Sequence, residues 1–360
     1  MHAHGEPLVL QDVPLPAELE PGAAIVRISC TTLCGTDAHL WEGRLAGIVD
    51  VAMPMIHGHE MTGCVAAIDC DDMRDALGRP IAIGDRIVWS EAVCGHCYAC
   101  TVLGETVMCE RRGMGFAQRA DRVPYAVGGL SEYVYVRPGA QRLLVPEEVK
   151  DAWAAAAACA GKTTVRAFGK AGGIAPGMKV VVQGAGPLGL FATAYARAGG
   201  AATVITIDAS AARLDLARAW GADETISLRD LPDADGRVAW VRELTGGLGA
   251  DLVLDLAGGP TSAREGVLMA ARKGAYLAVG IAGPGAEAIP MHAVMRGELR
   301  VLGSLNGDIA DLATAIEFLR RERHRFDWDR MFDVPVGLAR ATGALEAMAR
   351  AKVIKPVVVP

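Results

Sequence analysis

The stretch Met178–Gly200, MKVVVQGAGPLGLFATAYARAGG, decides the fold. It begins with a continuous apolar run, continues through three closely spaced glycines, and then has the residue spacing of a helix that ends in paired glycines. A second apolar run, TVITID, follows at Thr203–Asp208 and ends in an acid. Strand, glycine loop, helix, strand and acid within about 30 residues form the pattern of a dinucleotide-binding βαβ unit. The sequence therefore predicts an α/β fold with a Rossmann-type, doubly wound parallel sheet.

Each glycine of this loop meets a separate requirement. Gly184 allows the tight turn, Gly186 lets the backbone approach a pyrophosphate, and Gly189 lets the helix pack closely on the strand. The helix N-terminus presents its amide groups to the phosphates. The predicted cofactor-binding residues of the loop are Gly184, Gly186, Pro187, Leu188 and Gly189.

Asp208 ends the second strand about 20 residues after the loop, where it would accept hydrogen bonds from the adenosine ribose and repel a 2′-phosphate. The sequence therefore favours NAD over NADP. Arg213 could cover the adenine, although a solvated surface arginine fits equally well. Gly280 lies at the carboxyl end of a later apolar run, where ligands bind in such sheets.

Further apolar runs predict the remaining strands. The runs at 251–259, 274–283 and 299–305, with helical segments between them, extend the parallel sheet to about six strands. Residues 309–323 have the apolar spacing of an amphipathic helix. Before residue 150 the sequence predicts a small β-rich domain made of short strands. The expected strands are at 9–13, 23–30, 63–68, 85–89 and 128–136. KPVVVP at 355–360 is expected to close the chain as a final strand.

Four cysteines lie within the sixteen-residue segment CGHCYACTVLGETVMC. Their spacing lets the sulfurs meet at one point only if the backbone wraps around it, as it does around a structural zinc. A redox C-x-x-C pair is disfavoured because the surrounding βαβ pattern is missing. The predicted zinc ligands are Cys94, Cys97, Cys100 and Cys109.

A second set of metal-binding side chains is scattered along the chain. Cys34 begins the segment CGTDAH, His59 lies in GHE, and Cys159 lies in CAGKTT. A catalytic zinc usually takes three protein ligands and keeps one position for water or substrate. By spacing alone, buried cysteines that pack as small hydrophobic residues, together with one satisfied histidine, remain an equal alternative.

Composition limits the function classes. A chain of 360 residues is too long for one core, and its 51% apolar and 22% charged residues are typical of an ordered globular protein. A net charge of −6 disfavours nucleic acid and anionic membrane surfaces as partners. The start lacks the pattern of a signal peptide, and no apolar run approaches the roughly 20 residues of a membrane span. We expect a cytoplasmic protein, in which clustered cysteines indicate metal binding rather than disulfides.

With the cysteine cluster, CGTDAH, GHE, CAGKTT and GAGPLG in this order, the sequence resembles the zinc-containing medium-chain alcohol dehydrogenases over nearly its whole length. The resemblance implies a GroES-like catalytic domain at 1–155 with a structural zinc lobe at about 94–109, a Rossmann domain at 156–306, and a C-terminal segment at 307–360 that completes the catalytic domain. It also implies a homodimer or homotetramer that binds two zinc ions per chain.

The resemblance carries roles to the residues of CGTDAH. Cys34 matches the first ligand of the catalytic zinc, and Thr36 the hydroxyl that takes the substrate's proton. Asp37 matches a carboxylate beneath the metal that tunes its charge. His39 matches a histidine that passes the proton to solvent.

The other two motifs complete the implied site. His59 and Glu60 match the second ligand and its neighbouring acid, which could orient a ligand or bind zinc transiently. Cys159 matches the third ligand, and Thr163 a threonine that packs by the nicotinamide. Lys162, just before it, faces an anionic group of the substrate, points to solvent, or pairs with a nearby carboxylate.

The activity implied is zinc-dependent hydride transfer between an alcohol, secondary or anionic, and NAD, which gives an aldehyde or ketone. A polyol or threonine-type dehydrogenase on the same scaffold is the first alternative. A dinucleotide-binding sensor without turnover is an alternative from a different class.

Overall fold

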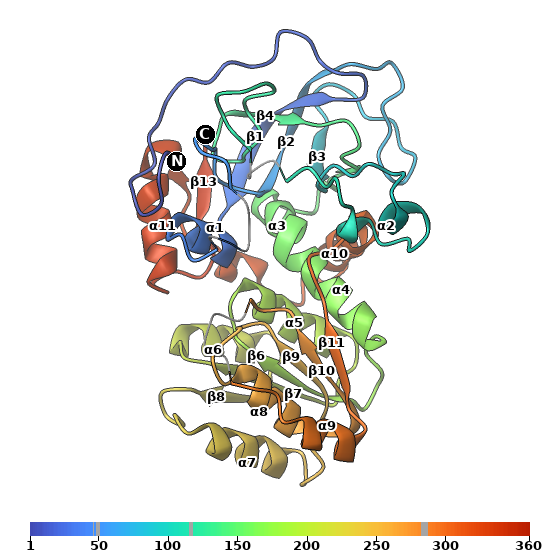
Figure 1. Cartoon of the computed structure of the whole chain (residues 1–360), viewed down its shortest axis with the longest axis vertical. Coiled ribbons are helices and arrows are strands. Elements are labelled where there is room, and N and C mark those ends of the chain that lie inside the picture. The colour runs from blue at the N-terminus through green and yellow to red at the C-terminus, as the bar shows by residue number, and fades with distance from the viewer. Residues whose placement is uncertain (46, 48–50, 115–117, 282–286) are drawn as a thin grey trace. The chain divides into compact units, whose positions relative to one another are not determined.

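The chain folds into two compact units in a computed structural model that describes residues 1–45, 47, 51–114, 118–281 and 287–360 (Figure 1). The first unit contains Met1–Lys162, Asp308–Arg323 and Trp328–Pro360, and the second contains Thr163–Gly307 and His324–Asp327. In the part of the chain that is described, no helix combines the length and the apolar character needed to cross a membrane.

The first unit is built on a seven-stranded sheet with the order β12-β13-β1-β2-β3-β5, and β4 pairs with β1. The strands are β1 (Ala24–Thr32), β2 (Glu60–Ile68), β3 (Arg86–Trp89), β4 (Tyr133–Val136), β5 (Arg142–Leu144), β12 (Val336–Gly337) and β13 (Val357–Val359). Val26, Ile28, Val65 and Ile87 lie in one apolar cluster on this sheet. The C-terminal strand pairs antiparallel with β1, as the closing apolar run predicts.

One predicted strand is wrong. Residues 9–13 form no strand, and Val9 and Leu10 are 58% and 68% exposed. Their apolar side chains suggest a short strand, but a strand is stable only with a neighbour in a sheet. The first strand is therefore β1.

Short helices surround the first sheet. They are α1 (Gly35–Trp41), α2 (Tyr98–Thr101), the 3₁₀ turn η1 (Thr106–Met108), α3 (Asp151–Ala156), the π-helical turn η3 (Ala157–Gly161), α10 (Ile309–Arg321), the 3₁₀ turns η4 (Trp328–Met331) and η5 (Leu338–Arg340), and α11 (Ala341–Ala349). α1 directly follows the end of β1. The chain therefore leaves the sheet and turns into a helix at Cys34, the N-cap of α1.

The second unit is a six-stranded parallel sheet with the order β11-β10-β9-β6-β7-β8, which confirms the predicted doubly wound sheet. Its strands are β6 (Lys179–Gln183), β7 (Thr203–Asp208), β8 (Glu224–Ser227), β9 (Ala250–Asp255), β10 (Ala270–Ala278) and β11 (Arg300–Gly303). The strand order reverses between β6 and β9. Ligands bind at such a reversal, outside the carboxyl ends of the strands.

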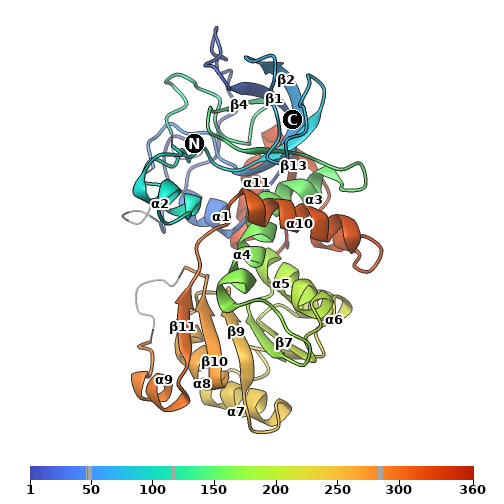
Figure 2. The same cartoon turned by 90° about the vertical axis from the view of Figure 1, so that its right-hand side faces the viewer.

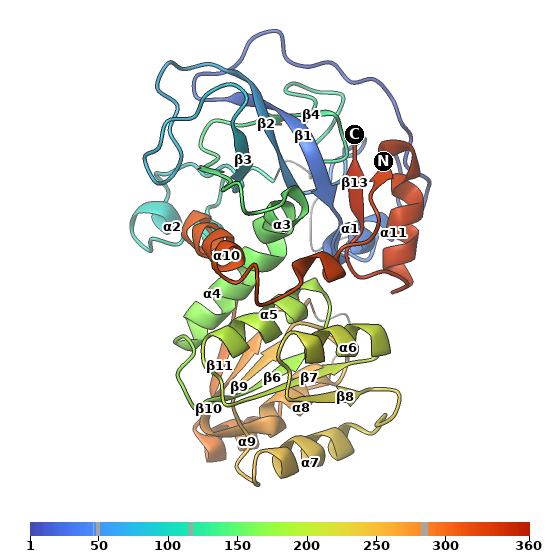
Figure 3. The ribbon, with the colours of Figure 1, turned by 180° about the vertical axis from the view of Figure 1, so that it is seen from behind.

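Helices cover both faces of this sheet. They are α4 (Lys162–Ala171), α5 (Pro187–Ala198), α6 (Ala211–Ala219), α7 (Ala234–Leu244), α8 (Ser262–Met269) and α9 (Met291–Gly297). α5 and α6 lie in front of the sheet in Figure 3, and α8 lies in front of it in Figure 1. Val180 and Val182 pack against Ala192 of α5, whereas Val181 packs against Val267 of α8. This double burial explains why β6 is a continuous apolar run.

Candidate metal and cofactor sites

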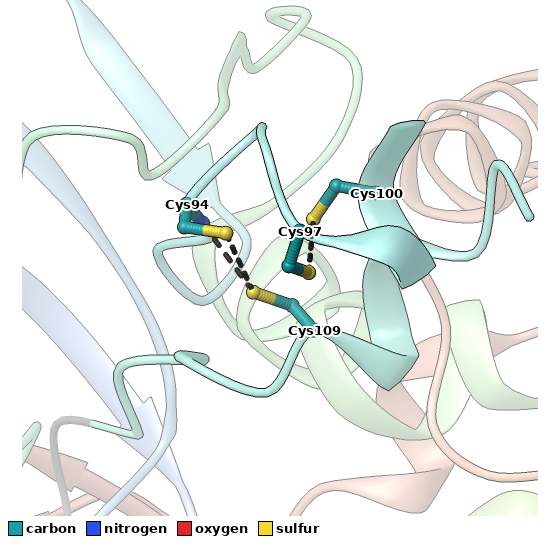
Figure 4. Close-up of side chains that lie close together, drawn as sticks. All are labelled: Cys94, Cys97, Cys100 and Cys109. Atoms are coloured by element: carbon teal, nitrogen blue, oxygen red, sulfur yellow. Dashed lines mark hydrogen bonds between the residues drawn. The ribbon is translucent and has the colours of Figure 1, made fainter. Parts of the chain in front are cut away.

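The four clustered cysteines converge. Their sulfurs all lie within 4.8 Å of one another, at the base of α2 (Figure 4). Cys97 Sγ lies 3.5 Å from Cys100 Sγ, and Cys109 Sγ lies 3.6 Å from Cys94 Sγ. A tetrahedron of thiolates at about 2.3 Å from zinc places its sulfurs about 3.8 Å apart. The donor set therefore fits a structural zinc.

The scattered ligands also converge, entirely within the first unit. One ligand atom from each of Cys34, His59, Glu60 and Cys159 lies within 4.8 Å of the others. Cys34 Sγ is 3.2 Å from His59 Nε2. Two thiols, one imidazole and one carboxylate at this spacing suit a zinc ion with three protein ligands, and Glu60 lies close by.

Asp37 contacts two of the candidate ligands, Cys34 and His59. One carboxylate oxygen accepts a hydrogen bond from the backbone of Cys34 at 3.0 Å, and the other lies 3.2 Å from His59 Nδ1. A carboxylate on the outer nitrogen of a histidine orients the ring so that the other nitrogen can bind metal. Burial alone would lower the pKa of His59, but Asp37 and the Cys34 sulfur raise it well above its usual value. Hydrogen bonding to Cys159 holds the pKa of Cys34 well below its usual range.

Glu60 has partners that sequence reasoning missed. Lys355 donates to its Oε2, and Thr32 donates to the same atom at 2.5 Å. Lys355 and Glu60 are both fully buried. Burial raises the pKa of Glu60 to about 7 against the opposing effect of Lys355. Glu60 Oε1 has no hydrogen-bond partner among the described residues, which leaves an acceptor for a metal ion or its water.

His57 is a second missed residue. Its ring is 1% exposed, and its Nδ1 lies 3.9 Å from the same oxygen of Asp37 that faces His59. Asp37 thus lies between two imidazoles. The motif GHE draws attention to His59 and Glu60, whereas the histidine before the glycine carries no signal of its own.

Cys159 occupies the centre of the π-helical turn η3, between α3 and α4. Such turns widen a helix locally and often occur at functional sites. Thr36 and His39 lie on α1, and both are partly exposed. The His39 side chain is 41% exposed, with Nδ1 3.9 Å from Glu42. The structure therefore brings the predicted ligands together and gives His39 access to solvent.

The predicted cofactor loop links β6 to α5 in the second unit. Gly184 has φ of +96°, and a Cβ at Gly189 would lie 1.7 Å from the carbonyl oxygen of Gly184. Both positions therefore require glycine. Nothing lies within 4 Å of a Cβ built on Gly186, which caps α5 before Pro187 and leaves open space at the helix N-terminus. A phosphate fits such a cradle. Leu188 follows in the first turn, partly exposed.

The remaining predicted cofactor residues lie at the carboxyl edge of the same sheet or on α4. Asp208 ends β7, and its carboxylate accepts hydrogen bonds from Ala185 at 2.7 Å and Ser210 at 2.8 Å. It is thereby held against the glycine loop. Gly280 follows β10, where a Cβ would lie 2.4 Å from Gly258 N. Arg213 is partly exposed on α6, and Thr163 is buried on α4.

Lys162 is in an ion pair. Its Nζ lies 2.8 Å from Glu91 Oε2, and its side chain is 2% exposed. Of the three alternatives for Lys162, the structure favours the one in which it pairs with a carboxylate. Both residues line a cavity of about 50 Å³ that also borders His59 and Trp89. The wall of this cavity therefore carries a compensated pair of charges rather than an isolated positive charge.

Two family models match the chain. The alcohol dehydrogenase GroES-like domain matches residues 20–147, and the zinc-binding dehydrogenase domain matches residues 187–321. The chain is 32% identical to 5-exo-hydroxycamphor dehydrogenase of Pseudomonas putida, over 94% of this chain and 92% of the relative. It is 30% identical to a probable D-xylulose reductase A of Aspergillus fumigatus, over 85% and 81%.

Among solved structures, an alcohol dehydrogenase from Thermotoga maritima matches with a TM-score of 0.91 and 30% identity, over all of this chain and 97% of that one. The matches cover both units. The chain therefore belongs to the zinc-binding, medium-chain alcohol dehydrogenase family and is a zinc-dependent alcohol oxidoreductase.

Proposed function

We propose that the protein oxidises secondary alcohols to ketones with NAD as hydride acceptor, using a zinc ion held by Cys34, His59 and Cys159. One observation carries this proposal: ligand atoms of these three residues meet within 4.8 Å, although the residues are far apart in the chain. The carboxylate of Asp37 supports the outer nitrogen of His59, as a metal-binding histidine requires.

When bound, zinc supplies the Lewis acidity that favours the alkoxide near neutral pH, and nicotinamide accepts the hydride. Residues of the chain then carry the substrate's hydroxyl proton to solvent. The Thr36 hydroxyl accepts it from the substrate, and His39, exposed on the same helix, delivers it to solvent. Asp37 keeps His59 oriented, and Glu60 supplies a second carboxylate beside the ligands.

A second zinc ion is proposed for Cys94, Cys97, Cys100 and Cys109. Four thiolates leave no position for substrate, so this site contributes to folding rather than to the reaction. The predicted count is therefore two zinc ions per chain. Exposed apolar side chains on this lobe, such as Tyr98 at 62% and Val102 at 65%, show that it has little apolar core of its own.

A preference for NAD is supported by Asp208. Its carboxylate lies at the end of β7 beside the glycine loop, where a 2′-phosphate would bring a second negative charge. Ala209 and Ser210, which follow it, supply no positive charge. The proposed cofactor-binding residues remain the glycine loop, Asp208, Arg213, Thr163 and Gly280.

A secondary alcohol is favoured by the names of the relatives. Hydroxycamphor and xylulose are named in them, and both imply a secondary hydroxyl or the ketone derived from it. A polyol is the second candidate because of the D-xylulose reductase relatives. An anionic substrate has less support, since Glu91 already compensates the charge of Lys162.

We also propose a homo-oligomer. β11 is an edge strand of the six-stranded sheet (Figure 2), with Val301 41% exposed. Met291 and Met295 of the preceding α9 are 66% and 70% exposed. An open strand edge beside exposed apolar side chains favours pairing with a second copy.

The central experiment is a cofactor-reduction screen of the zinc-loaded protein. Primary, secondary, polyol and anionic alcohols are compared with NAD and with NADP, and zinc is counted in the same preparation. We expect two zinc ions per chain and the highest kcat/KM for a neutral secondary alcohol with NAD. One zinc ion per chain, or no reduction with any alcohol, would overturn the proposal.

A further inference from the structure

Two candidate metal-binding clusters of the first unit are joined by one ion pair, whose lysine is buried and whose glutamate is partly buried. Glu91 lies three residues before Cys94, and Lys162 lies three residues after Cys159. Their charged atoms are 2.8 Å apart, with side-chain exposures of 22% and 2%. The pair therefore links the chain entering the cysteine lobe to the helix that presents Cys159.

The backbone next to Glu91 is hydrogen-bonded to the segment that leaves the cysteine lobe. Ala92 pairs with Gly113 in an isolated bridge, and the amide of Gly113 donates to the carbonyl of Ala92 at 2.9 Å. The amide of Cys94 donates to Cys109 Sγ at 3.4 Å. The backbone around Glu91 is thus the stem of the lobe, and anything that orders the four sulfurs also orders this stem.

The Lys162 side is fastened to the third ligand. Lys162 is the first residue of α4, directly after the π-helical turn that contains Cys159. Helical backbone hydrogen bonds connect the two, because the amide of Lys162 donates to the carbonyl oxygens of Ala157 and Cys159. A shift of the Lys162 side chain should therefore also shift the π-helical turn and change the position of the Cys159 sulfur.

The opposite charges of Lys162 and Glu91 stabilise their ion pair. Burial would raise the pKa of the Glu91 carboxyl, but Lys162, with a smaller contribution from Arg112, lowers it to about 2. The Glu91 carboxyl is therefore charged at neutral pH. Removing one partner of a largely buried pair costs more than breaking a pair on the surface, because the remaining charge loses its nearest opposite charge away from water.

We propose that the Lys162–Glu91 ion pair couples the two metal sites, so that zinc in the cysteine lobe slows the loss of zinc from the Cys34, His59 and Cys159 site. This inference rests on the proposed two-zinc function. It assigns Lys162 and Glu91 a positioning role and requires no contact with substrate.

A second ion pair provides a matched control. Arg86 of β3 pairs with Asp151 at the start of α3 at 2.9 Å, with exposures of 26% and 37%. It ties the first residue of β3 to the start of the helical run that leads to Cys159, away from the lobe stem. Asp151→Asn should therefore affect stability without affecting the coupling.

The test measures metal release to a coloured chelator from full-length protein carrying Co²⁺ at the catalytic site and Zn²⁺ in the lobe. Energetic coupling between sites commonly corresponds to a change of roughly 5- to 150-fold. We expect Glu91→Gln, Lys162→Met and the double variant each to release Co²⁺ about fivefold faster or more, and to shift the thiolate-to-cobalt absorption band. Asp151→Asn should match the wild type. Equal rates in all variants would overturn the proposal.

A cycle with the lobe variant Cys97→Ser isolates the coupling. In the wild-type background it should accelerate Co²⁺ release, whereas in the Lys162→Met/Glu91→Gln background it should add little. Equal acceleration in both backgrounds would overturn the proposal. If Cys97→Ser fails to fold, the release rates and the absorption band of the three pair variants decide the matter alone. Two zinc ions per wild-type chain and NAD reduction would show that the proposed function stands even if the coupling fails.

Discussion

Lys355 and Glu60 form a completely buried ion pair beside the proposed catalytic zinc, although 295 residues separate them in the chain. The C-terminal segment therefore reaches the metal site through a lysine just before β13. Thr32, at the end of β1, donates to the same carboxylate oxygen. Glu60, the acid of the GHE motif, thus accepts hydrogen bonds from both β1 and the C-terminal segment.

Lys355→Met should lower the free energy of unfolding by about 3 kcal/mol, because the buried Glu60 carboxyl loses its cation and must take up a proton or stay as an unpaired charge. Guanidinium unfolding of the zinc-loaded protein measures this. Lys355→Arg keeps the charge and should retain most of the stability. If Lys355→Met is as stable as the wild type, the pair does not stabilise the fold.

Cys97→Ser and Cys34→Ser should have different consequences. Cys97→Ser should lose one zinc ion and lower the melting temperature, because a closed four-thiolate site contributes to folding. Cys34→Ser should abolish turnover while the fold persists. Zinc analysis, circular dichroism and activity distinguish the two, and equal loss of folding in both variants would contradict two separate sites.

Asp208→Ser should shift the ratio of kcat/KM for NAD to that for NADP about tenfold or more toward NADP, which corresponds to about 1.4 kcal/mol of repulsion removed. Asp215→Asn changes an exposed carboxylate on α6 that pairs with Arg218, and it serves as the matched control. A wild type that already prefers NADP would show that Asp208 does not set the preference.

His39→Gln should slow alcohol oxidation most at low pH, because glutamine cannot carry the proton to solvent, and zinc content should not change. The side chain is 41% exposed and is not one of the converging ligands. The profile of kcat against pH and a zinc assay are the measurements. Loss of zinc in this variant would identify His39 as a ligand.

Local patterns were sufficient for the Rossmann unit and the cysteine lobe. The glycine loop lies where β6 meets α5, because the turn, the close packing at Gly189 and the helix start depend on consecutive residues. The four lobe cysteines can meet because they lie within one short segment. Their convergence needs little help from the rest of the fold.

Local sequence patterns were insufficient where the structure of a segment depends on residues far away in the chain. Residues 9–13 carry the apolar side chains of a short strand, but in the structure they pair with no strand of the sheet. The three scattered ligands could be assembled from the sequence only through resemblance to a family. Nothing in the local sequence marks His57, or shows that Cys159 occupies a π-helical turn.

By itself, the sequence determined the two-part fold class, the glycine loop and the four candidate zinc ligands of the cysteine lobe. Only the tertiary structure showed that Lys355 neutralises Glu60 and that Lys162 neutralises Glu91, across 295 and 71 residues of chain. The physical reason is that a lysine in a sequence carries the same charge whether it faces water or a buried carboxylate. Its partner is chosen by the packing of distant segments, and a buried charge persists only where that packing supplies an opposite one.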